Sequence, residues 1–71
     1  MEPSKLSREF GRRLRAARLE RGLTQEDVAQ LTGIPQTHLS KLEAGKRLPE
    51  YITMHKLTRA FSRMQVTELL L

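Results

Sequence analysis

The chain has 71 residues, which is enough for one small domain. It has no cysteine, which excludes disulfides, thiolate metal sites and cysteine nucleophiles, and with only two histidines we expect no metal and no other cofactor. Its 13 basic residues, mostly arginine, outnumber 8 acidic ones and give a net charge of +5, which indicates an anionic partner such as a phosphate backbone. No apolar run approaches the roughly 18 residues of a membrane helix and no signal peptide is visible, so we expect no membrane partner. The absence of cysteine fits a cytoplasmic protein.

The first predicted helix spans about residues 7–21 and follows an N-terminal arm of residues 1–6. Ser7 is expected to cap this helix, because its hydroxyl can accept a hydrogen bond from the free N–H groups of the first turn. Apolar residues recur at spacings of four, four and three along one face: Leu6, Phe10, Leu14 and Ala17. Gly22 is expected to end the helix.

The second predicted helix spans about residues 24–32. Thr24 and Asp27 form a near capping box at its start, and Gly33 is expected to end it. The residues of this helix that are expected to face inward are Val28, Ala29 and Leu31.

The third predicted helix spans about residues 35–44. Pro35 is tolerated in its first turn, because the N–H that proline lacks is not needed there. Leu39 and Leu42 are expected to face the core, and Gly45 to end the helix.

Two further helices are predicted after a basic loop of residues 46–49. The fourth spans about residues 50–61 and carries an apolar stripe of Met54, Leu57 and Phe61. A short fifth helix spans about residues 66–70. Since none of the five is long enough to be stable alone, they predict a compact all-α domain whose core is assembled from several helices.

The second and third helices are separated by only Gly33 and Ile34. Two helices joined so tightly cannot lie antiparallel, so they must cross steeply in a helix-turn-helix arrangement. Ala29 allows the helices to approach closely, Gly33 can adopt a positive φ in the turn, and Leu39 packs the third helix back on the second.

Four residues of this motif carry the pattern of a known family: Gln25, Ala29, Gly33 and Leu39. Three segments outside the motif carry it too: residues 14–18, 42–46 and 66–70. With these segments the chain resembles the lambda-repressor/Cro/Xre-type helix-turn-helix family over roughly residues 8–70, with Pro35 at a position where the family often has serine. The resemblance implies a compact five-helix domain that binds double-stranded DNA.

On a helical wheel, the third helix turns a polar side without acidic residues away from Leu39 and Leu42. The side chains expected to contact base edges are Gln36, Thr37, Ser40 and Lys41. In the major groove, glutamine can pair with adenine, lysine with guanine, and threonine can touch the methyl group of thymine. The alternative is a solvated helix face without function, but the helix-turn-helix context favours base reading.

Phosphate contacts are expected from residues around this helix. Gln25 begins the second helix, whose N–H groups and positive dipole end can bind a phosphate, and the resemblance implies the same role. Lys46 and Arg47 in the basic loop are further candidates, as is His38 at the margin of the third helix. Each of these side chains could instead be an ordinary surface residue.

Arg18 and Glu43 are expected to form a structural ion pair. Both lie at the margin of an apolar stripe, and the resemblance places them in contact. A half-buried pair between helices would fix the angle of the third helix, whereas the alternative is two unrelated surface charges.

These features predict a bacterial or phage transcriptional regulator, a repressor, that occupies a double-stranded DNA operator. No paired carboxylates, glycine-rich phosphate loop or hydrolase motif is present, so no enzymatic activity is expected. Two alternatives stay open. The chain could be an antitoxin that binds a toxin protein and represses its own promoter, or a DNA-binding module of a longer regulator.

A single recognition helix covers too few base pairs to discriminate one site in a genome. We therefore expect a homodimer, at least on DNA, that reads an inverted repeat. The expected dimer interface is Leu69, Leu70 and Leu71. Three consecutive leucines spread over about 200° on a helix, so they cannot all face the core of their own domain.

Overall fold

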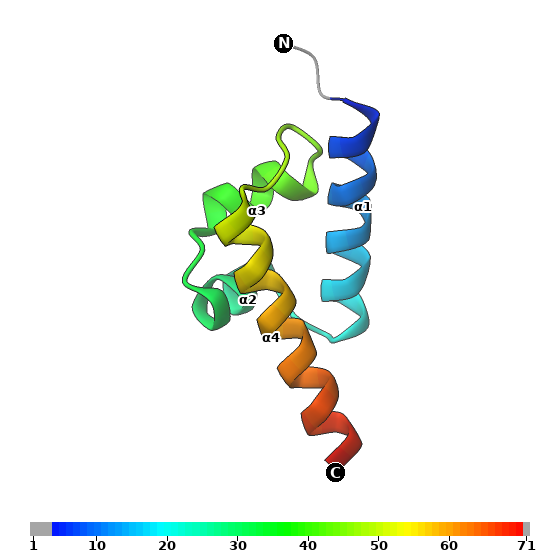
Figure 1. Cartoon of the computed structure of the whole chain (residues 1–71), viewed down its shortest axis with the longest axis vertical. Helices are drawn as coiled ribbons and strands as arrows, with labels where there is room; N and C mark the ends of the chain where they lie inside the picture. Colours follow the sequence, from blue (N-terminus) through cyan, green and yellow to red (C-terminus); the bar gives the residue numbers. More distant parts are fainter. Residues whose placement is uncertain (1–3, 71) are drawn as a thin grey trace.

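The computed structural model describes the backbone of residues 4–70 and the side chains of residues 4–62. The described residues form four helices: α1 (Lys5–Glu20), α2 (Gln25–Thr32), α3 (Gln36–Glu43) and α4 (Tyr51–Leu70). α3 packs against both α1 and α2, and α4 packs against α2 (Figure 1). The predicted all-α class is confirmed. In the described part of the chain, no helix is long and apolar enough to cross a membrane.

The prediction of five helices was wrong, because α4 runs without a break from Tyr51 to Leu70. The expected interruption falls within residues 62–65, a segment that contains neither glycine nor proline. Nothing in that segment removes a backbone hydrogen bond or favours a left-handed residue, so the helix continues. The C-terminal part of α4 extends away from the other three helices (Figure 1).

The start of α1 also differs from the prediction. Ser4, not Ser7, is the N-cap: its Oγ accepts a hydrogen bond of 3.0 Å from the Ser7 N–H. Ser7 is instead buried inside the helix, which begins two residues earlier than expected. The buried stripe of α1 is Ser7, Gly11, Leu14 and Arg18. Leu6, expected in the core, lies about 100° from that stripe and is 66% exposed.

The capping box predicted for α2 is confirmed. The Asp27 N–H donates to Thr24 Oγ1 over 3.0 Å, and the Thr24 N–H donates to Asp27 Oδ2 over 2.8 Å. The Thr24 backbone N–H, and to a lesser degree the Thr24 side chain, lowers the pKa of Asp27. These bonds satisfy donors of the first turn that would otherwise lack an intrahelical partner, and so fix where α2 begins.

The buried apolar core combines residues from all four helices and the turn between α2 and α3. Its members are Leu14, Val28, Ile34, Leu39, Leu42 and Leu57, with Phe10, Leu23, Ala29 and Phe61 packed against them. Burying one such side chain contributes about 1.5–3 kcal/mol, so the core draws together helices that are too short to be stable alone. Arg21 at the end of α1 adds a contact with α4, since its guanidinium lies 4.8 Å from the centre of the Phe61 ring.

Two other predicted core residues lie at the surface. Leu31 is 57% exposed, because the short helix α2 packs through its Val28 side. Met54 is 40% exposed, and the neighbouring Thr53 is buried in its place. The spacing of apolar residues predicts the stripe on each helix. Which residues of a stripe are buried depends on the angle at which the neighbouring helices pack against it.

Candidate nucleic-acid interface

A three-residue turn joins α2 to α3. Gly33 ends α2 in the left-handed region with φ of 78°, and its N–H donates to the Ala29 carbonyl over 2.8 Å. The Thr32 hydroxyl donates to the Val28 carbonyl and accepts from the Ile34 N–H. Ile34 is 3% exposed, so the turn is held by its own buried side chain as well as by hydrogen bonds. Neither the role of Thr32 nor the burial of Ile34 was predicted from the sequence.

Pro35 is the N-cap of α3, with φ of −57° and ψ of 142°. No side chain caps this helix end. The Pro35 carbonyl accepts from the N–H groups of His38 and Leu39, at 3.0 and 3.1 Å. Proline can therefore stand at this position because the helix needs its carbonyl oxygen and not an N–H.

The apolar and polar side chains of α3 lie on opposite faces of the helix, as their spacing predicts. Leu39 and Leu42 are 1% and 0% exposed. All four residues that we expect to contact bases are exposed: Gln36, Thr37, Ser40 and Lys41. Their exposure makes them available to a ligand, and their contact with bases stays a prediction.

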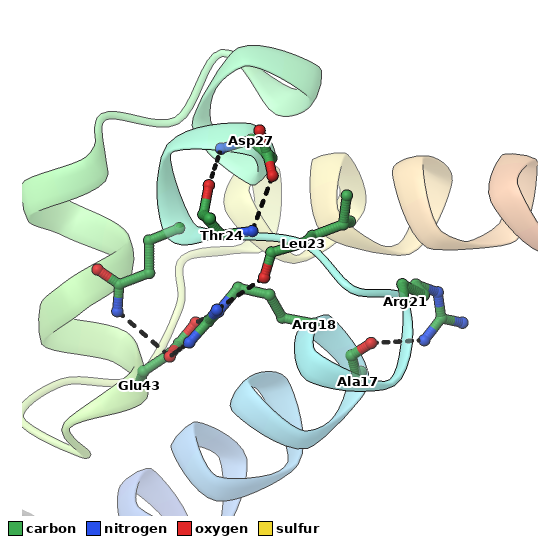
Figure 2. A network of polar contacts seen from close by, with 8 residues as sticks. Ala17, Arg18, Arg21, Leu23, Thr24, Asp27 and Glu43 are labelled. Atoms are coloured by element: carbon green, nitrogen blue, oxygen red, sulfur yellow. Dashed lines mark hydrogen bonds and ion pairs between the residues drawn. The ribbon is translucent and has the colours of Figure 1, made fainter.

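An ion pair between Arg18 and Glu43 connects α1 to the end of α3 (Figure 2). Arg18 Nε lies 2.7 Å from Glu43 Oε2, and Arg18 Nη2 lies 3.0 Å from Glu43 Oε1. The two side chains are only 11% and 6% exposed. Arg18 Nη1 also donates to the Leu23 carbonyl over 2.8 Å. The hydrogen bond to Glu43 raises the pKa of Arg18, since it stabilises the charged guanidinium against the cost of burial.

Gln25 belongs to the same network. Its Nε2 donates to Glu43 Oε1 over 3.2 Å, which connects the start of α2 to the end of α3. The side chain that we expect to contact phosphate is thus oriented by a partner within the domain. An amide nitrogen has two hydrogens, so the second remains available to another acceptor.

A close approach between α1 and the end of α3 holds this arrangement. Gly11 is buried, and a Cβ at that position would lie 2.7 Å from the Glu43 carbonyl oxygen, closer than atoms can pack. Gly45 has φ of 75°, and a Cβ there would lie 2.9 Å from the Cα of Arg8. The role of Gly11 was not predicted from the sequence. The available signal was a glycine in the interior of a helix, which costs stability unless close packing requires it.

The basic loop after α3 is exposed at both predicted phosphate contacts. Lys46 is exposed, and its N–H donates to the Lys41 carbonyl over 3.0 Å. Arg47 Nη2 lies 3.6 Å from Glu50 Oε1, and the two side chains are 43% and 69% exposed. This long, exposed pair is weak, so a phosphate can compete for Arg47.

His38 lies differently from the other predicted phosphate contacts. It is half-buried, and its Nε2 is covered without a hydrogen-bond partner among the described residues. The placement does not favour a phosphate contact through that nitrogen. Leu69, Leu70 and Leu71, expected at a dimer interface, fall outside the residues whose side chains the structure describes.

Comparison with known proteins agrees with this geometry. A family described as helix-turn-helix domain matches residues 9–70, so the chain belongs to that family. An uncharacterised HTH-type transcriptional regulator of Methanothermobacter thermautotrophicus is 34% identical over 56 residues, which cover 79% of this chain and 81% of the relative.

Two further relatives match over shorter stretches. The uncharacterised HTH-type transcriptional regulator y4dJ of Sinorhizobium fredii is 49% identical over 43 residues, which cover 61% of this chain and 56% of the relative. The HTH-type transcriptional repressor RghR of Bacillus subtilis is 42% identical over 52 residues, which cover 72% of this chain and 38% of the relative. The matched region thus spans about half of one relative and well under half of the other.

Proposed function

We propose that the protein is a transcriptional regulator that binds double-stranded DNA in a sequence-specific manner and reads the major groove with α3. The observation that carries the proposal is the outer face of α3, which is exposed, polar and free of acidic side chains on a helix-turn-helix whose inner face is fully buried. The names of the relatives, all regulators and one a repressor, support the same role. We assign it a binding role and not a catalytic one, exerted in the cytoplasm where the DNA lies.

The side chains of α3 suit the donor and acceptor patterns of base edges. Gln36 can pair with adenine, Lys41 with guanine, and Thr37 can touch a thymine methyl group. Ser40 lies on the same face and can donate or accept. Gln36 is exposed in the first turn of α3, and no side-chain cap engages that helix end.

Phosphate contacts would then fix the register of α3 on the duplex. Gln25 at the start of α2 and Lys46 beyond the end of α3 lie at the two ends of the helix-turn-helix. Contacts from both would hold the recognition helix between them. Arg47 would join them by exchanging its weak pair with Glu50 for a phosphate oxygen.

Binding as a dimer to an inverted repeat is part of the proposal. One α3 of eight residues reaches only a few base pairs, and two copies related by a twofold axis would read half-sites about 34 Å apart. Repression would follow from occupancy of the operator. No observation here favours the antitoxin alternative over this reading.

Selection from a pool of random duplexes tests the proposal. Repeated binding and sequencing should enrich one motif, and a dimer should enrich that motif as an inverted repeat. The protein with both Gln36 and Lys41 changed to alanine is the control, and it should enrich no motif or a degenerate one. A wild-type selection that returns unbiased sequence would contradict sequence-specific binding.

A further inference from the structure

An open groove of about 460 Å³ lies on the flank of the domain, between α1 and the end of α3. Its basic lining consists of Arg8, Arg12 and Arg15, and its apolar lining consists of Ala16, Leu19 and Ala44. No predicted base-contacting residue lines it. The groove is therefore a feature that the proposed DNA-reading face does not explain.

The three arginines form one stripe along α1, since they are spaced by four and three residues. At a rise of about 1.5 Å per residue, the stripe is about 10 Å long. Arg15 has no hydrogen-bond or ion-pair partner among the described residues, and Arg12 contacts only the exposed Glu9 on its own helix, at 2.6 Å. Arg15 thus presents an unpaired charge to the groove, and Arg12 shares the single carboxylate of Glu9 with Arg13.

Glu43 also borders the groove, but it does not neutralise these arginines. Its carboxylate already accepts two hydrogen bonds from Arg18 and one from Gln25. The charge that faces the groove is therefore that of the arginine stripe.

The apolar residues of the lining allow a comparison of two anionic ligands, a nucleic-acid backbone and an acidic protein helix. Leu19 is 54% exposed, and Ala16 and Ala44 are exposed beside it. A phosphate backbone gains nothing from such a surface, whereas an amphipathic helix buries its own apolar residues against it while its acidic residues meet the arginines. The combination fits a protein segment better than a nucleic acid.

We propose that this groove binds an acidic amphipathic helix of a partner protein. A helix that runs parallel to α1 would match the lining with acidic residues at i, i+4 and i+7, opposite the arginine stripe, and a leucine at i+11, opposite Leu19. Glu43 and Ala44 border the groove at the end of α3, about 10 Å along the helix from Gln36 in the first turn. The groove and the predicted base contacts therefore consist of different residues, and the proposal does not depend on the DNA-reading role.

A synthetic helical peptide with glutamate at i, i+4 and i+7 and leucine at i+11 tests the proposal against a scrambled peptide of the same composition. Titration followed by fluorescence anisotropy should give tighter binding of the patterned peptide. Arg15→Glu should weaken that binding about tenfold or more, because it replaces an attraction with a repulsion. The matched control is Arg59→Glu, the same charge change at an exposed residue of α4 outside the groove. It should change the affinity by much less.

Three results would overturn the proposal. The patterned peptide could bind no better than the scrambled one, or Arg15→Glu and Arg59→Glu could weaken it equally. The third result would come from binding to random-sequence duplex DNA. If Arg15→Glu weakens duplex binding clearly more than Arg59→Glu does, the groove binds the phosphate backbone instead of a protein helix. Leu19→Gln leaves the charge of the groove unchanged, so it should weaken binding of the peptide but not binding of duplex DNA. Retention of the folded circular dichroism spectrum in each variant ties these results to the groove.

Discussion

Arg18 of α1 holds Glu43, the last residue of α3, through two parallel hydrogen bonds of 2.7 and 3.0 Å (Figure 2). The same guanidinium also donates to the Leu23 carbonyl in the connection between α1 and α2. One side chain therefore ties α1 both to the segment that leads into α2 and to the far end of α3. Such a planar, bidentate contact fixes orientation as well as distance, so it sets the angle at which α3 leaves the domain.

Removal of either partner of this pair should destabilise the domain. Arg18→Ala or Glu43→Ala would leave one nearly buried charge unpaired, at a cost of about 3–5 kcal/mol. The double variant should lose less than the sum of the two single losses, as expected for residues in direct contact. Chemical denaturation gives the free energies of unfolding. Strict additivity of the two losses would show that Arg18 and Glu43 do not interact. Glu9→Ala is the control: it removes an exposed ion pair and should change the free energy of unfolding little.

Gly11→Ala should destabilise the domain, although alanine is the better helix former. The added methyl group would meet backbone oxygens at the end of α3, and backbone cannot move aside as a flexible side chain can. We expect a net loss of about 1–3 kcal/mol. Ala16→Gly, at an exposed position of the same helix, should also cost stability, by about 1 kcal/mol through helix propensity alone. A gain in melting temperature for Gly11→Ala would contradict the close approach.

The local signals of the sequence predicted local structure well. Thr24 and Asp27 are three residues apart and specify a capping box by themselves, and Gly33 specifies the end of α2 by itself. The contact of Arg18 with Glu43 joins residues 25 positions apart, so only the family resemblance could suggest it. The separate fifth helix was predicted from the pattern along the chain, and the resemblance agreed with it, although residues 62–65 contain no helix breaker.

Burial was harder to predict, because it depends on how the helices meet. Leu6, Leu31 and Met54 have the spacing of core residues but lie where no neighbouring helix covers them. Ser7 and Thr53 are polar and yet buried. The arginine-lined groove could not be predicted either, because it exists only where α1 passes the end of α3.

Asp27 should make stability depend on pH in the acid range. The Thr24 backbone N–H, with the Thr24 side chain, holds the pKa of Asp27 below its ordinary value, so the folded state favours the ionised carboxylate. This contribution is fully present above the ordinary pKa of about 4 and is lost as the pH falls through the lower pKa of the folded state. Asp27→Asn should therefore be less stable than the wild type near pH 7, and the difference should shrink toward pH 2. Urea unfolding across this range measures it, and a difference that stays constant with pH would contradict the capping role of the charge.

Affinity for DNA should depend steeply on salt. Each phosphate neutralised contributes about −0.9 to the slope of log K against log salt concentration. Lys46→Ala should weaken binding to all duplexes alike and make this slope less steep by about one unit. Lys56→Ala, an exposed lysine of α4 outside the proposed interface, is the charge-matched control and should leave the slope nearly unchanged. If both variants change the slope equally, Lys46 makes no specific phosphate contact on the duplex.

Contact of the outer face of α3 with base edges can be tested by comparing binding to two duplexes. The affinities of the wild type, Gln36→Ala and Lys41→Ala would be measured at one salt concentration on the selected operator and on an unrelated duplex. Each substitution should cost about 1–3 kcal/mol on the operator and much less on the unrelated duplex, because a lost base contact matters only where the matching base is present. An equal loss on both duplexes would contradict base reading by α3 and leave these side chains with a general electrostatic role.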